Sequence, residues 1–178
     1  SFGLLGQMYI AERKALYNTI VNHRPRQCYE IGTYTGGGST YFLTSAFAKI
    51  DQGELISMES DNYYYTKAIN YYKNKLPKLN KHVKFIHSDK PEAFIHLIPS
   101  DGKVDCVFFD GAEDGKQTLE QFRFFEPNFK TGSVIIFHDW NTEKTIDVKP
   151  VLTNNSDWEP ILELTPPNSI GLAIFKHQ

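Results

Sequence analysis

Cysteine and long apolar runs are both scarce in this chain. Its 178 residues include two cysteines, Cys28 and Cys106, which lie in separate apolar stretches and form no Cys-x-x-Cys pair. Two cysteines cannot build the disulfide framework of a small secreted protein, so we expect buried free thiols in the reducing cytoplasm. No apolar run is long enough to cross a membrane, and we expect no membrane partner.

Net charge is also small. The chain has 19 Lys and Arg against 21 Asp and Glu, which gives a formal net charge of -2. Nucleic-acid binding usually rests on a basic surface, so we expect no DNA or RNA partner. The lysine-rich stretch 73–84 is interrupted by Pro77 and is predicted to be a solvated surface. The length and the 40% hydrophobic content predict one domain over residues 1–178.

Short apolar runs recur along the chain and predict the strands of a sheet. The predicted strands are a run that ends at Glu30 and residues 54–59, 82–87, 104–109, 133–137, 161–164 and 171–176. The last two strands are joined by a connection so short that they must pair antiparallel. We therefore predict a mostly parallel, seven-stranded sheet with a reversed last strand.

Stretches with helical spacing separate these strands. The predicted helices comprise one with Leu5, Met8, Tyr9, Leu16 and Ile20, one at 41–47, a tyrosine-rich helix after Asp61, a short helix at 91–98 and one at 116–129. Strict alternation of strands and helices predicts an α/β fold that is doubly wound, with helices on both faces of the sheet.

A glycine-rich loop follows the first strand. Gly32 and residues 36–38 can take positive φ and let a ligand approach the backbone, and Ser39 and Thr40 are suitable caps for the next helix. Backbone N–H groups and a helix N-terminus converge at such a turn, which predicts a nucleotide-like ligand. The alternative is a tight turn that needs glycine only for packing. Three adjacent glycines favour the ligand, because each costs about 0.5–1 kcal/mol inside regular structure.

Acidic residues stand at or just after the ends of five predicted strands: Glu30, Glu59, Asp89, Asp110 and Asp139. The carboxyl ends of parallel strands meet at the edge of the sheet where ligands bind. A single acid at such a position is often a helix cap. Five of them in register predict a binding crevice.

The spacing Glu30-x-Gly32-x-x-x-Gly36 differs from the Gly-x-Gly-x-x-Gly of dinucleotide folds. Over nearly its whole length the chain resembles the class I S-adenosylmethionine (SAM)-dependent methyltransferases. The resemblance implies a Rossmann-like sheet, SAM as cofactor, ribose hydroxyls bound by Glu59 and the adenine edge near Asp89. The cofactor-binding residues that it implies are Glu30, Gly32, Thr33, Tyr34, Gly36, Gly38, Ser39, Glu59, Ser88, Asp89 and Asp110.

Within that superfamily, Asp110 and residues 138–141 are similar to the metal-dependent O-methyltransferases of catechols and antibiotic sugars. This resemblance implies a small-molecule acceptor with a hydroxyl group, the catalytic residues Asp110, His138 and Asp139, and Mg²⁺ or a similar divalent cation at Asp110 and Asp139. Mg²⁺ prefers oxygen ligands and lowers the pKa of a bound hydroxyl.

Two positions depart from that pattern. Trp140 separates Asp139 from Asn141, and Ala112 stands where a second acid is common. Without a metal, His138 is the expected general base, since its pKa lies near neutrality. Trp140 could stack on a ligand, but we expect an indole packed in the core.

Two other functions remain open on the sequence alone. One is a cofactor-binding module without catalysis, which the small size of the chain favours slightly. The other is a nicotinamide-dependent oxidoreductase, which the glycine spacing, the reversed strand and the lack of a Tyr-x-x-x-Lys pair disfavour. The aromatic clusters 63–65 and 122–125 are expected to pack in the core, although a homodimer is also compatible with them.

Overall fold

The computed structural model describes residues 8–178. Leu5, which was expected in the first helix, lies outside this range. The chain divides into two compact units, Ser1–Asp89 and Lys90–Gln178, and each is described by itself. One domain over residues 1–178 stays a prediction.

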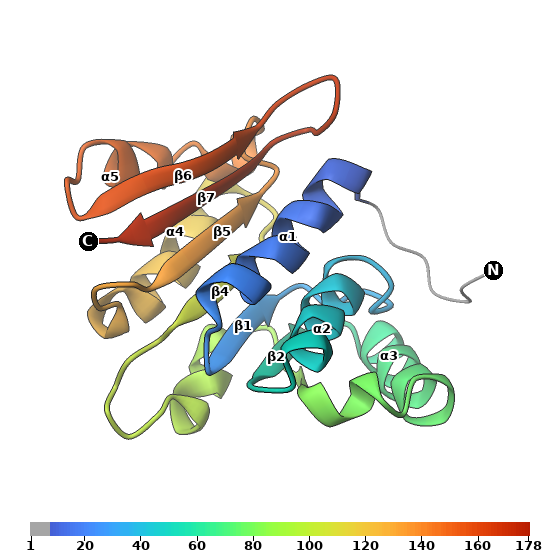
Figure 1. Ribbon diagram of the computed structural model, residues 1–178. Coiled ribbons are helices and arrows are strands. Elements are labelled where there is room, and N and C mark those ends of the chain that lie inside the picture. Colours follow the sequence, from blue (N-terminus) through green and yellow to red (C-terminus); the bar gives the residue numbers. More distant parts are fainter. Residues whose placement is uncertain (1–7) are drawn as a thin grey trace. The chain divides into compact units, whose positions relative to one another are not determined.

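The first unit alternates helices with parallel strands (Figure 1). Strand β2 pairs in parallel with β1 on one side and with β3 on the other. The elements are α1 (Ile10–His23), β1 (Gln27–Ile31), α2 (Ser39–Ile50), β2 (Glu54–Glu59), α3 (Asn62–Lys75), the 3₁₀ helix η1 (Leu79–His82) and β3 (Val83–His87). Because the three strands are parallel, Glu30, Glu59 and the residues after His87 come to the same edge.

Helices of the first unit bury their apolar sides against each other and against the strands. Helix α1 packs along α2, α2 contacts β2, and α3 contacts β2 and β3. Leu16 and Phe47 are fully buried in this packing. In the tyrosine-rich helix α3, Tyr72 is fully buried, whereas Tyr63 is 65% exposed. The prediction that the 63–65 cluster packs in the core was therefore wrong for Tyr63.

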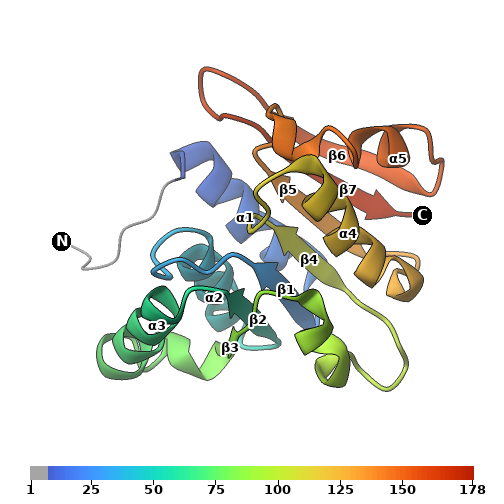
Figure 2. The same cartoon turned by 180° about the vertical axis from the view of Figure 1, so that it is seen from behind.

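The second unit contains the reversed strand. Its elements are the 3₁₀ helix η2 (Pro91–Leu97), β4 (Cys106–Phe109), α4 (Gly115–Phe125), η3 (Glu126–Asn128), β5 (Val134–His138), η4 (Glu143–Thr145), α5 (Lys149–Thr153), β6 (Trp158–Leu164) and β7 (Leu172–His177). Strand β4 pairs in parallel with β5, and β7 is antiparallel to both β5 and β6. Figure 2 shows α4 in front of the strands of this unit. The predicted seven strands are all present, and the last one is reversed.

Two stretches of the second unit differ from expectation. The helix expected at 116–129 ends at Phe125, because Pro127 has no N–H for the helical ladder and the chain continues as η3. The stretch between Asn141 and Pro160, for which no helix was predicted, contains η4 and α5. The cluster at 122–125 is packed as expected at its ends, since Phe122 and Phe125 are fully buried.

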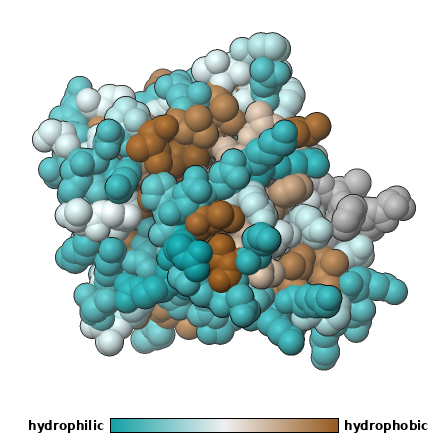
Figure 3. Space-filling view, viewed as in Figure 1, coloured by the Kyte–Doolittle hydropathy of each residue, from teal (hydrophilic) through white to brown (hydrophobic). Residues whose placement is uncertain are grey.

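Apolar side chains remain exposed on the outer strand of this unit. Ile161 and Leu162 of β6 are 40% and 36% exposed, and Figure 3 shows apolar residues gathered over β6 and β7. A homodimer stays a prediction. In the described part of the chain, no helix combines the length and the apolar character that a membrane span needs. Cys28 and Cys106 are buried free thiols, as expected.

Candidate active site

The glycine loop between β1 and α2 turns sharply at three residues with positive φ. These are Gly32 (φ 103°), Tyr34 (φ 52°) and Gly36 (φ 75°). Glycine adopts such angles without a steric penalty, whereas for Tyr34 the left-handed conformation is strained. The N–H groups of Gly32 and Thr33 donate to the carbonyl oxygen of Met58, at 3.0 and 3.1 Å. The start of the loop is therefore fixed to the end of β2.

A buried tyrosine holds the other end of the loop. The hydroxyl of Tyr72 in α3 donates to the carbonyl oxygen of Gly36 at 2.8 Å. Burial raises the pKa of Tyr72, so this hydroxyl keeps its proton and remains a donor. A Cβ atom on Gly36 would lie 3.0 Å from Cε2 of Tyr72, which is tighter than ordinary van der Waals contact, and the positive φ would strain any other residue there.

Glu59 links this loop to the edge of the sheet. Its Oε2 accepts the backbone N–H of Tyr34 at 2.6 Å, and its Oε1 accepts that of Asp61 at 2.9 Å. Glu59 is 9% exposed, and each carboxylate oxygen has a second lone pair. The carboxylate is thus oriented by backbone donors and can still accept hydrogen bonds from two hydroxyl groups.

Glu30 lies deeper than Glu59 and is fully buried. Its Oε2 accepts hydrogen bonds from the hydroxyls of Thr40, at 2.8 Å, and Ser57. The Ser57 hydroxyl also lies within hydrogen-bonding distance of that of Thr33. These contacts tie α2, β2 and the glycine loop together around the carboxylate.

The expected helix caps were wrong in detail. Gly38 occupies the cap position of α2 and contributes no side-chain hydrogen bond, and Ser39 is the first helical residue. Thr40 uses its hydroxyl on Glu30 instead of on the helix terminus. Both Ser39 and Thr40 are buried, so they pack beneath the loop.

The residues after β3 include the last two cofactor-binding residues predicted in the first unit. The N–H of Ser88 donates to the carbonyl oxygen of Glu59 at 3.0 Å, which places Ser88 beside the end of β2. Asp89 is exposed. The rings of His87 and Tyr65 stack with centroids 5.2 Å apart, which adds a flat aromatic surface near this point.

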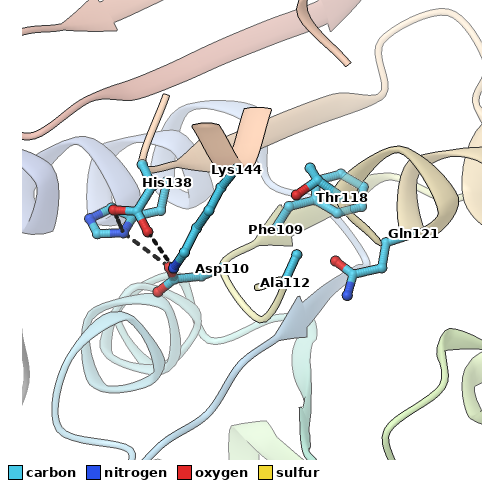
Figure 4. Close-up of a pocket in the computed structure, with 8 residues that line it drawn as sticks. Phe109, Asp110, Ala112, Thr118, Gln121, His138 and Lys144 are labelled. Carbon is cyan, nitrogen blue, oxygen red and sulfur yellow. Dashed lines mark hydrogen bonds and ion pairs between the residues drawn. The ribbon is translucent and has the colours of Figure 1, made fainter. Parts of the chain in front are cut away.

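In the second unit, the ends of β4 and β5 bring three predicted catalytic residues together, and Figure 4 labels two of them, Asp110 and His138. Nδ1 of His138 lies 3.0 Å from Oδ1 of Asp110 and 3.3 Å from Oδ1 of Asp139. Ionised carboxylates only accept hydrogen bonds, so this arrangement favours the tautomer that has its proton on Nδ1 and its lone pair on Nε2. Burial raises the pKa of Asp110, and the hydrogen bond from His138 partly offsets this rise.

Lys144 belongs to this cluster, although the sequence analysis missed it. Its Nζ lies 2.8 Å from Oδ2 of Asp139, and its positive charge lowers the pKa of Asp110 against the effect of burial. A lysine five residues after a predicted catalytic acid is no sequence signal for an ion pair with that acid. The turn that brings it back becomes visible only in the structure.

A small pocket adjoins the cluster. Residues of four segments line it: Phe109, Asp110, Ala112, Thr118, Gln121, His138, Asp139 and Lys144. Figure 4 shows Thr118 and Gln121 on α4, away from Lys144 and His138. Gln121 is 4% exposed, and its Oε1 has no hydrogen-bond partner among the described residues. Gln121 is a second residue that sequence reasoning missed.

Trp140 is packed as expected. It is 4% exposed, and its ring contacts those of Phe137 and Phe175, with centroid distances of 5.6 and 5.2 Å. Asn141, in contrast, is exposed. The residue that was weighed as a ligand-stacking group therefore belongs to the core.

Asp110, His138 and Asp139 each offer one atom within 4.8 Å of the others, which is a spacing that a metal ion could span. Mg²⁺ prefers oxygen ligands, but here the third donor is a nitrogen that already faces both carboxylates. The other oxygen of Asp139 holds the ammonium group of Lys144. As arranged, this donor set does not fit Mg²⁺, and a metal at Asp110 and Asp139 stays a prediction.

Sequence comparison gives the family. The model of a family described as a methyltransferase domain matches residues 29–140 of this chain. The chain belongs to this methyltransferase domain family. The matched range runs from β1 to Trp140 and includes the glycine loop, Glu59, Asp110, His138 and Asp139, but not Lys144. A search of curated proteins finds no match.

Solved structures resemble this methyltransferase in fold. A Klebsiella pneumoniae protein assigned as an O-methyltransferase has a TM-score of 0.76 and 15% identity, covering 97% of this chain and 82% of that one. The O-methyltransferase of Bacillus cereus, in complex with S-adenosylhomocysteine (SAH), has a TM-score of 0.75 and 15% identity, covering 97% and 83%. TomG of Streptomyces achromogenes, an O-methyltransferase of tomaymycin synthesis in complex with SAM, has a TM-score of 0.71 and 16% identity, covering 94% and 80%. These likenesses confirm the predicted Rossmann-like class of the methyltransferase.

Proposed function

We propose that this methyltransferase transfers the methyl group of SAM to a hydroxyl group of a small molecule. The observation that carries the proposal is the bond between Glu59 and the N–H of Tyr34, which fixes a buried carboxylate against the glycine loop. The SAM complex of TomG and the SAH complex of the Bacillus cereus enzyme support this choice of cofactor. Three O-methyltransferase folds among the similar structures support an oxygen acceptor.

The residues of the first unit fit SAM in chemistry. Glu59 would accept the two ribose hydroxyls, because its oxygens keep lone pairs beyond those used by Tyr34 and Asp61. Gly32 and Gly36 would let the amino-acid part approach the backbone. Ser88 and Asp89 would meet the adenine edge. Glu30 would act indirectly, because its hydrogen bonds with Thr40 and Ser57 would hold the glycine loop in its conformation.

SAM supplies a methyl group on a sulfonium, which an oxygen nucleophile takes while the carbon–sulfur electron pair stays on sulfur. The residues of the second unit would prepare that nucleophile. His138 would accept the hydroxyl proton at Nε2, since Nδ1 is protonated and faces Asp110. Asp110 and Asp139 would hold the imidazole in position and stabilise it when it becomes charged. Asp110 as a further cofactor contact remains part of the proposal.

Partners and location belong to the proposal as well. We expect a small-molecule acceptor and no nucleic acid. The buried free thiols of Cys28 and Cys106 support a reducing cytoplasm as the place of action.

Calorimetric titration with SAM and SAH tests the cofactor assignment. Wild-type protein should bind both, and Glu59→Ala should lose this binding. Glu54→Ala, at the opposite end of β2, should retain it, because Glu54 pairs with Lys84 at 3.0 Å and faces the other edge. If wild-type protein does not bind SAM or SAH at millimolar concentration, the proposal is wrong.

A methyl-transfer screen then tests the acceptor class. Radiolabelled SAM is offered with phenols, catechols and sugars that differ in the hydroxyl group. The proposal is supported if wild-type protein methylates at least one hydroxyl compound. The O-methylated form of that compound should not be methylated, and the His138→Gln variant should not methylate the compound. SAM binding without transfer to any of them would favour the non-catalytic module.

A further inference from the structure

Both oxygens of Asp139 lie close to nitrogen atoms of this chain. Oδ2 lies 2.8 Å from Nζ of Lys144, and Oδ1 lies 3.3 Å from Nδ1 of His138. Figure 4 shows the Lys144 side chain reaching into the carboxylate cluster. The ammonium group therefore stands against the carboxylate that a divalent cation would need.

The backbone that carries Lys144 is shaped to bring it there. Asp139 has φ 54°, which reverses the chain directly after β5. The N–H and the hydroxyl of Thr142 both donate to the carbonyl oxygen of Asp139, at 2.9 and 2.8 Å. The hydroxyl of Thr145 donates to the carbonyl oxygen of Trp140 at 2.8 Å. Lys144 thus sits in the 3₁₀ helix η4, whose two ends are tied back to the end of β5.

Helix α4 supports the same turn from another side. A Cβ atom on Gly115 would lie 2.8 Å from Cγ2 of Ile146 and 3.0 Å from the carbonyl oxygen of Glu143. The absence of a side chain at Gly115 lets the first turn of α4 approach η4 this closely. With η4 held by β5 and by α4, the Lys144 backbone has little freedom to move away from Asp139.

Charge favours one cation over two in this cluster. Asp110 and Asp139 bring two negative charges, and Lys144 brings one positive charge that acts on both of them. A divalent ion among the same oxygens would lie within a few ångströms of the ammonium group, and like charges at that distance repel strongly when partly buried. The ammonium group of Lys144 and a divalent metal ion therefore exclude each other beside Asp139.

We propose that Lys144 takes the place of a divalent cation in this methyltransferase. Its ammonium group supplies the fixed positive charge beside the acceptor, and methyl transfer proceeds without a bound metal. This inference rests on the proposed function. The acceptor hydroxyl gives its proton to His138, and Lys144 stabilises the oxygen as negative charge develops on it. That oxygen then forms the bond to the methyl carbon, and the carbon–sulfur electron pair leaves with the sulfur.

Mn²⁺ binding, measured by electron paramagnetic resonance, tests this without any need for a methyl acceptor. Wild-type protein should leave the signal of free Mn²⁺ unchanged when protein and Mn²⁺ are each present at up to about 1 mM. At that concentration, only a weak complex would escape detection. Lys144→Met removes the ammonium and should bind Mn²⁺ at least about tenfold more tightly than wild type. Adding Asp139→Asn to Lys144→Met should abolish that binding.

Lys116→Met is the matched control, because Lys116 is also paired with a carboxylate, that of Glu120 at 3.9 Å, but on the exposed face of α4. It should behave as wild type. Mn²⁺ binding to wild-type protein that Asp139→Asn removes would overturn the inference, and so would equal behaviour of wild type and Lys144→Met. Failure of the proposed function would appear separately, as an absence of SAM binding in calorimetry.

Discussion

The hydroxyl of Tyr72 donates a hydrogen bond to the carbonyl oxygen of Gly36, so a buried side chain of α3 holds the glycine loop in place. The same ring lies where a Cβ atom on Gly36 would come within 3.0 Å of it. The loop geometry therefore depends on a residue that lies 36 positions later in the chain.

Tyr72→Phe should loosen this loop while leaving the aromatic packing of α3 intact. The carbonyl of Gly36 loses its donor in a buried place, and we expect a fall of about 1–2 kcal/mol in the free energy of unfolding. SAM affinity should fall several-fold, because the loop is less preorganised. Urea denaturation and calorimetry measure the two effects. Tyr63→Phe is the control, since Tyr63 is 65% exposed, and equal effects of the two variants would contradict the prediction.

Glu59→Gln should impair SAM binding although the side chain keeps its shape. The amide nitrogen cannot accept a hydrogen bond, so either Tyr34 or Asp61 loses the acceptor of its N–H, and one ribose hydroxyl loses its partner. We expect the dissociation constant for SAM to rise at least about tenfold. Glu54→Gln on the same strand should bind as wild type. Unaltered SAM affinity in Glu59→Gln would remove Glu59 from the site.

His138→Gln should separate catalysis from cofactor binding. Glutamine has no basic nitrogen to take the acceptor proton, and we expect the methyl-transfer rate to fall about 100-fold. SAM affinity should change far less than the rate, because the residues proposed to hold the ribose and the loop lie in the first unit and only the Asp110 contact adjoins His138. His96→Gln in η2 is the control, since His96 is exposed. Rates within a factor of about two of wild type would be incompatible with His138 as the base.

Gly171→Ala should disturb the loop that carries Asp139 and Lys144. A Cβ atom there would lie 2.5 Å from the backbone N of Asn141 and 2.9 Å from that of Trp140, and φ at this residue is 129°. We expect a loss of more than about 2 kcal/mol in the free energy of unfolding. Gly102→Ala is the control, because Gly102 also has a positive φ, at 68°. A Cβ atom there would lie 3.5 Å from its nearest neighbour, so the substitution should lower the free energy of unfolding by about 1–2 kcal/mol. Thermal unfolding of both variants gives the comparison, which fails if Gly102→Ala is the more damaging.

The strands of this fold could be predicted from the sequence because buried parallel strands are short apolar runs that need no further information. Residues 54–59 were predicted as a strand and form β2, and the reversed β7 followed from the short connection before it. The acids at the strand ends could be named for the same reason. Each of these acids stands where an apolar run stops. The direction of its strand then decides at which edge of the sheet the acid lies.

Packing within helices was less predictable. Successive helical residues point about 100° apart, so a run of three tyrosines cannot face the sheet with every ring. Tyr63 is accordingly exposed while Tyr72, further along α3, is fully buried. A run of like residues conceals which of them faces inward, because the pattern has no polar side to mark the surface.

Lys144 could not be predicted, because its place depends on a backbone reversal at Asp139 and not on any periodic pattern. Its ion pair with Asp139 arises from the hydrogen bonds of Thr142 and Thr145, which are ordinary loop residues in the sequence. Gln121 is similar, since an amide on the buried side of a helix looks like a surface residue until the helix is placed.

The direction of β7 has a practical consequence for handling the protein. Leu172 pairs with His138 at one end of β5, and Lys176 pairs with Val134 at the other. Four residue steps along a strand span about 13 Å, so the chain leaves the sheet at the end away from Asp139. A fluorophore or surface tether attached at Gln178 would therefore lie away from Asp139, which makes this position suitable for immobilising the enzyme for binding measurements.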